Sequence, residues 1–213
     1  MMRKAAVEAI GTFFFILTIG MVVIEPGAGA FAPLAIGSAL MVMIYAGGHV
    51  SGGHFNPAVT LGVFLRGKAG RADLGWYWGA QVLGAIVAFI AVRGLKGGYT
   101  VTPMELAPAP ALLAEFLFTF ALVWVVLNVA TTKANQGNSH YGLAIGFTVM
   151  VGAYAIGGIS GCAINPAVAI GLTLMGVSTV ANLWIYLVAE LLAGVAAALV
   201  FNALASEADK SPA

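Results

Sequence analysis

Long apolar runs separated by short polar breaks dominate this chain. Six of these runs are close to the roughly 20 residues that an α-helix needs to cross the hydrocarbon core of a bilayer. We therefore predict an all-α integral membrane protein with six transmembrane helices. The predicted spans cover approximately residues 5–23, 32–48, 74–92, 111–130, 141–157 and 180–203.

Two further apolar stretches, 51–65 and 160–175, share one pattern that differs from the six spans. Each begins with Ser-Gly, reaches an Asn-Pro-Ala triplet, and ends before its helix is long enough to span a bilayer. Asn is a preferred helix N-cap and Pro fits the first helical position, so each triplet predicts the start of a short helix. The triplets are Asn56-Pro57-Ala58 and Asn165-Pro166-Ala167.

Such half-helices at membrane depth are tolerated only where protein buries them or where they line a wet cavity. When they occupy matching positions in two halves of a membrane protein, they indicate the path of the solute. We therefore predict two re-entrant half-helices beside a solute path.

The second triplet follows the first by about half the length of the chain, and other residues recur at the same offset. Three spans in each half is an odd number, so the two halves enter the membrane from opposite sides. We predict one membrane domain, 1–213, made of inverted repeats 1–100 and 101–213. Recurring pairs are Tyr77 with Tyr186 and Gln81 with Glu190, and Glu8 and Glu115 head similar Glu-x-x-x-Thr-Phe segments.

Aromatic residues cluster where the third and sixth spans begin. We interpret them as anchors at the membrane–water interface, where amphipathic rings are enriched. They are Trp76, Tyr77, Trp78, Trp184 and Tyr186.

Composition supports the membrane assignment, since 61% of the residues are hydrophobic and 8% are charged, against roughly 25% charged in soluble domains. Membrane lipid is therefore an expected partner. The net charge of +1 gives no reason to expect a nucleic acid partner. With one cysteine and no Cys/His cluster, we predict no metal site and no cofactor.

The basic residues predict the orientation, because cytoplasmic loops carry an excess of Lys and Arg. We expect a multi-pass protein of the cell (inner) membrane with both termini in the cytoplasm. A cleaved signal peptide at the N-terminus is the alternative, but Glu8 interrupts the first run, and that run has a counterpart in the second half. The basic residues on the N-terminal side are Arg3, Lys4, Arg66, Lys68, Arg71, Lys133 and Lys210.

Two half-helix N-termini that meet near the midplane give the predicted site its chemistry. Each carries roughly half a unit of positive charge, and the Asn amides add hydrogen-bond donors. Such a site accommodates the oxygen of a neutral solute and repels cations. Intramembrane carboxylates leave an alternative open, an ion-coupled secondary transporter of a small solute. No nucleophile–base set or phosphate motif indicates an enzyme.

On these triplets and the paired Glu-x-x-x-Thr-Phe segments, the chain resembles the aquaporins, or major intrinsic proteins. The resemblance implies six tilted helices around a pore in each subunit, assembled as a homotetramer. It also implies passive conduction of water or small uncharged solutes. Glu8 and Glu115 then have a structural role, bracing the re-entrant loops.

One position departs from the family pattern. Most relatives have Arg directly after the second triplet, at the outer constriction, whereas this chain has Val168. By ungapped spacing, the resemblance places Ile36, Ala153 and Cys162 at the other constriction positions. This set predicts a wide, apolar selectivity filter. It would pass glycerol-like polyols, urea or neutral metalloid hydroxides such as arsenite, and exclude ions by their desolvation cost.

Overall fold

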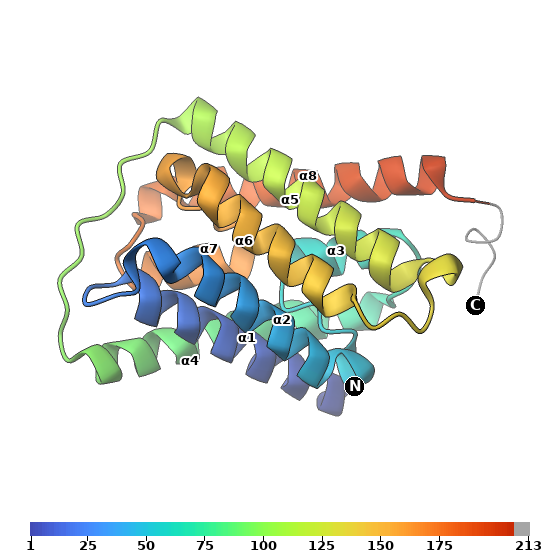
Figure 1. The fold of residues 1–213 in the computed structure, drawn as a ribbon, viewed down its shortest axis with the longest axis horizontal. Helices are drawn as coiled ribbons and strands as arrows, with labels where there is room; N and C mark the ends of the chain where they lie inside the picture. The colour runs from blue at the N-terminus through green and yellow to red at the C-terminus, as the bar shows by residue number, and fades with distance from the viewer. Residues whose placement is uncertain (207–213) are drawn as a thin grey trace.

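The computed structural model describes residues 1–206, and within them it contains helices and no β-strand (Figure 1). Six helices are long and apolar enough to cross a membrane. They are α1 (Met2–Val23), α2 (Ala32–Ser51), α4 (Arg71–Lys96), α5 (Pro108–Thr131), α6 (Tyr141–Ser160) and α8 (Leu183–Leu204). Two short helices, α3 (Pro57–Leu65) and α7 (Pro166–Leu174), start at the Asn-Pro-Ala triplets. Single 3-10 turns lie at Gly29–Phe31, Lys133–Asn135 and Val180–Asn182.

The long helices pack in the same order in the two halves of the described chain. Helix α1 packs on α2 and α4, and α5 packs in the corresponding way on α6 and α8. The short helices join the halves, because α3 packs mainly on α8 and α7 packs mainly on α4. The start of α1 and the end of α8 lie at one end of the molecule, and the segment between α4 and α5 lies at the other (Figure 1).

Two glycines allow α2 and α6 to cross at close range. A Cβ atom added to Gly37 would lie 2.6 Å from the backbone oxygen of Gly146, and one added to Gly146 would lie 2.5 Å from the oxygen of Gly37. Neither glycine could therefore carry a side chain without separating the helices. Small residues allow this kind of close backbone approach between membrane helices.

The helix ends differ from the predicted span ends for local reasons. Helix α4 begins at Arg71, where the Asp73 carboxylate accepts a hydrogen bond from the Gly70 N–H at 3.1 Å, and it ends before Gly97 in a left-handed conformation. Helix α5 begins at Pro108, because Pro fits the first helical turn. Apolar runs predict the membrane-embedded part of a helix, and capping residues extend it into the polar region. Lys210, which the orientation prediction counts among the cytoplasmic basic residues, lies outside the described residues.

Candidate solute pathway

Asn56 and Asn165 cap the two short helices and also connect the two re-entrant loops. The Oδ1 of Asn56 accepts from the Ala58 N–H at 2.8 Å, and the Oδ1 of Asn165 accepts from the Ala167 N–H at 2.9 Å. Pro57 and Pro166 occupy the first helical positions, as the triplets predict.

The side-chain nitrogen of each Asn donates a hydrogen bond to the opposite loop. Asn56 Nδ2 donates to the Ile164 oxygen, and Asn165 Nδ2 donates to the Phe55 oxygen, each at 2.9 Å. The sequence predicts both amides as hydrogen-bond donors to a solute. One N–H of each amide is instead used to hold the loops together, which leaves the second N–H for a solute.

The loop residues before the caps have backbone conformations that favour glycine. Phe55 has φ of 48°, Cys162 has φ of 52° and Ile164 has φ of 41°. A positive φ at a β-branched residue such as Ile164 is a true outlier, with a cost of roughly 1–3 kcal/mol. The loops hold these conformations only because other contacts stabilise them.

Two buried glutamates supply those contacts in matching ways. Glu8 accepts hydrogen bonds from the Ser51 hydroxyl at 2.7 Å and from the backbone N–H groups of His54 at 2.9 Å and Phe55 at 2.7 Å. These bonds fasten the first loop to α1, which supports the bracing role that the family resemblance assigns to Glu8.

Glu115 makes the same set of contacts in the second half. It accepts from the Ser160 hydroxyl at 2.5 Å and from the N–H groups of Ala163 at 3.0 Å and Ile164 at 2.6 Å. Both glutamates are fully buried. Ser51 and Ser160 were not singled out in the sequence, although both precede the triplets in the repeated pattern.

Tyr77 and Tyr186 are not interfacial anchors, so that interpretation is wrong for these two residues. Each side chain is 2% exposed, and its hydroxyl donates to a backbone oxygen, of Ser51 or Ser160 respectively, at 2.6 Å. Their recurrence at the repeat offset was the signal for this shared role. Trp76 and Trp184 remain more than half exposed.

Three cavities follow one another through the molecule past the triplets. The cavity lined by Val168, named the outer cavity after the predicted orientation, measures about 230 Å³. The central cavity measures about 10 Å³, and the cavity lined by His49, named the inner cavity, measures about 570 Å³. Phe15, Val149 and Ala163 line both the outer and the central cavity, and His54 lines both the central and the inner one. The shared walls place the cavities end to end.

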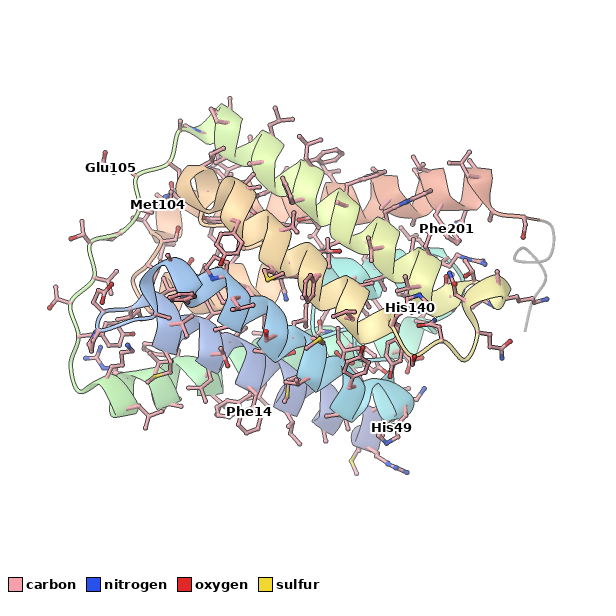
Figure 2. All side chains as sticks on the ribbon, in the orientation of Figure 1. Phe14, His49, Met104, Glu105, His140 and Phe201 are labelled. Carbon is pink, nitrogen blue, oxygen red and sulfur yellow. The ribbon has the colours of Figure 1, made fainter. Side chains whose placement is uncertain are left out.

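The outer and inner cavities open toward opposite ends of the bundle. Met104 lines the outer cavity and His49 lines the inner one, and Figure 2 shows these two residues at opposite ends. Asn56 and Asn165 line the narrow central cavity. Its volume is close to the minimum that holds one water molecule.

The whole described fold and this cavity system agree with one protein family. A family model described as "Major intrinsic protein" matches residues 1–201. The chain belongs to the major intrinsic protein family. This result confirms the predicted all-α membrane fold and the prediction of a channel for water or small neutral solutes. It also favours a channel over the coupled transporter and over any enzyme.

Similarity to individual proteins supports the family assignment. The chain is 36% identical to "Glycerol uptake facilitator protein-like 6" of Lactiplantibacillus plantarum, over 97% of this chain and 100% of that protein. It is 35% identical to "Aquaporin NIP1-4" of Oryza sativa subsp. japonica, over 96% of this chain and 77% of that protein. The fold matches the X-ray structure of the aquaglyceroporin from Plasmodium falciparum with a TM-score of 0.80 and 24% identity, over 95% and 96% of the two chains.

All four residues proposed for the outer constriction of this family member line the outer cavity. They are Ile36 of α2, Ala153 of α6, Cys162 of the second loop and Val168 of α7. Four separate elements therefore converge on one opening. None of the described residues that line this cavity is Asp, Glu, Lys, Arg or His.

Met104 lines the outer cavity, although no pattern in the sequence predicts it there. It lies in the segment between α4 and α5, outside the six spans and two half-helices predicted from the sequence. The Met104 N–H donates to the Val177 oxygen at 3.0 Å, so the segment is fastened over the outer cavity. No periodic pattern marks such a residue, because its position depends on a contact with a distant loop.

Proposed function

We propose that the chain is a passive channel whose outer constriction admits neutral solutes bulkier than water. Candidate solutes are glycerol-like polyols, urea and neutral metalloid hydroxides such as arsenite. One observation carries this proposal: the outer cavity has an uncharged wall, with Val168 where the family pattern places Arg. A small apolar side chain at this position leaves room for a solute with apolar surface.

Ions are excluded by two features of the same pathway. An ion that enters the apolar outer cavity loses hydration that Ile36, Ala153 and Val168 cannot replace. At the central cavity, the N-termini of α3 and α7 both present partial positive charge, which repels cations. Neutral solutes do not meet either barrier to the same extent.

The relatives support this proposal, since one is named a glycerol uptake facilitator and another an aquaporin. The proposal includes a homotetramer, which rests on family resemblance, and the inverted repeats 1–100 and 101–213. It also places both termini in the cytoplasm beside the inner membrane. Among the described basic residues, only Arg93 and Lys96 lie toward the end where α4 meets the segment over the outer cavity.

A swelling assay with a panel of solutes tests the proposed function. We expect proteoliposomes that contain the protein to swell in stopped-flow experiments with urea and glycerol, and the rates to be independent of an imposed proton or sodium gradient. A coupled transporter would concentrate a solute when the gradient is imposed. Accumulation against a gradient, or swelling with water alone, would contradict the proposal.

A further inference from the structure

The two glutamates that brace the loops have different partners on the third helix of each half. In the first half, Gln81 Nε2 of α4 donates to the Glu8 carboxylate at 2.8 Å. The same nitrogen donates its second N–H to the Thr60 hydroxyl at 3.1 Å. Glu8 therefore receives a fourth hydrogen bond, and both N–H groups of the Gln81 amide have an acceptor.

In the second half, the repeat replaces both of these polar partners. Glu190 of α8 stands where Gln81 stands, and Ala169 stands where Thr60 stands. Glu190 is fully buried, and neither carboxyl oxygen accepts a hydrogen bond of normal geometry within the part of the chain that the structure describes. Its polar neighbours are the Glu115 carboxyl and the backbone N–H of Asn165.

Two carboxylates cannot both be ionised in this position. They face each other in the apolar interior, where like charges repel and each charge loses its hydration. Besides the two carboxyl groups themselves, the titratable groups nearby are Cys162 on the loop and Tyr186 on α8, and α3 and α7 contribute none. No described cation among these neighbours could neutralise a second negative charge.

We propose that Glu190 carries a proton and donates it in a hydrogen bond to Glu115. A carboxylic acid then fills the place that the Gln81 amide fills at Glu8. The second Glu190 oxygen remains an acceptor facing the Asn165 N–H. The pair holds one negative charge, as Glu8 does alone in the first half.

The number of hydrogen-bond donors explains why an acid fits position 190 better than an amide. An amide at position 190 would have two N–H groups, but Ala169 offers no acceptor for the second one. A carboxylic acid has one O–H, and Glu115 accepts it. In the first half, the second N–H of Gln81 donates to the Thr60 hydroxyl. The second half lacks both groups, because Glu190 has no such N–H and Ala169 has no hydroxyl.

Glu190 is accordingly a positioning residue for the outer constriction. Glu115 holds the backbone of Ala163 and Ile164, and Cys162 of the same loop lines the outer cavity. Protonated Glu190 holds Glu115 in place by a hydrogen bond and adds no second negative charge next to the loop. At alkaline pH that removes this proton, the pair repels and the loop loses its support. The assignment does not depend on which solute passes.

Infrared spectroscopy of the reconstituted full chain tests the protonation directly. At neutral pH we expect a carbonyl-stretch band of a protonated carboxylic acid that shifts in D₂O. E190Q should remove this band, whereas E105Q, which changes an exposed glutamate between α4 and α5, should leave it. A wild-type spectrum without the band, or a band that survives in E190Q, would overturn the proposal.

Two further readouts separate a proton-dependent role from simple packing. Swelling rates of the wild type should fall at alkaline pH, and those of E190Q should show no such fall. A169T/E190Q, which copies the first-half set of Gln and Thr, should unfold at a higher temperature than E190Q alone. If the alkaline fall is the same in E190Q, or if A169T/E190Q unfolds at the same temperature or lower, the donor–acceptor account is wrong.

Discussion

Replacing Glu115 with alanine is expected to abolish swelling activity and to lower the free energy of unfolding by about 3 kcal/mol or more. The substitution leaves the N–H groups of Ala163 and Ile164 buried without an acceptor, at roughly 1–3 kcal/mol each. Ile164 would also lose the contact that holds its φ of 41°. Unfolding in detergent micelles and stopped-flow swelling measure the two effects.

Matched variants distinguish this role from a general effect of removing a carboxylate. E8A should cause a loss of similar size, because Glu8 makes the same three contacts with the first loop. E105A should be neutral within about 0.5 kcal/mol, because Glu105 is exposed. An E115A protein that unfolds and conducts like the wild type would contradict the bracing role.

Replacing Val149 with tryptophan is expected to stop swelling for every solute while the protein still folds. Val149 of α6 lines both the outer and the central cavity, so a large ring at this position fills the narrowest part of the path. The central cavity measures only about 10 Å³. Overpacking costs typically 1–3 kcal/mol, which should lower the melting temperature without preventing assembly.

Val151 provides a control on the same helix, because it is 54% exposed on the surface of the molecule and does not line the cavities. V151W should fold and conduct like the wild type. Size-exclusion chromatography and thermal melting show whether each variant is folded before its swelling rate is compared. A folded V149W protein with wild-type swelling rates would show that solutes do not use this chain of cavities.

The fold was predictable because its signals are local and strong. Apolar runs of sufficient length predicted the six long helices, and the Asn-Pro-Ala triplets predicted the starts of α3 and α7 at Pro57 and Pro166. The exact ends of α4 and α5 were less predictable. They depend on capping residues such as Asp73 and Gly97, which lie beyond the apolar runs.

The candidate site was predictable only in part, because hydrogen-bond partners across the fold leave little trace in one sequence. The family pattern placed Ile36, Ala153, Cys162 and Val168 at one constriction, and all four residues line the outer cavity. It gave no reason to place the Tyr186 hydroxyl on the Ser160 oxygen. Glu190, one of the intramembrane carboxylates that left the transporter alternative open, is in our proposal the partner of the bracing Glu115.

The selectivity of the outer constriction is tested most directly at Val168. V168R places a long cationic side chain in the outer cavity, whereas V168M adds length without charge. We expect V168R to reduce the swelling rate with glycerol and urea by about tenfold or more, which corresponds to a barrier increase of roughly 1.4 kcal/mol. The rate with water should fall less, and V168M should give intermediate values.

The decisive measurement is the ratio of glycerol to water permeability in wild-type and V168R proteoliposomes that contain equal amounts of folded protein. The account predicts a ratio that falls sharply in V168R, because the arginine narrows the opening for the larger solute. An unchanged ratio in folded V168R would contradict the claim that the four residues around the outer cavity select the solute.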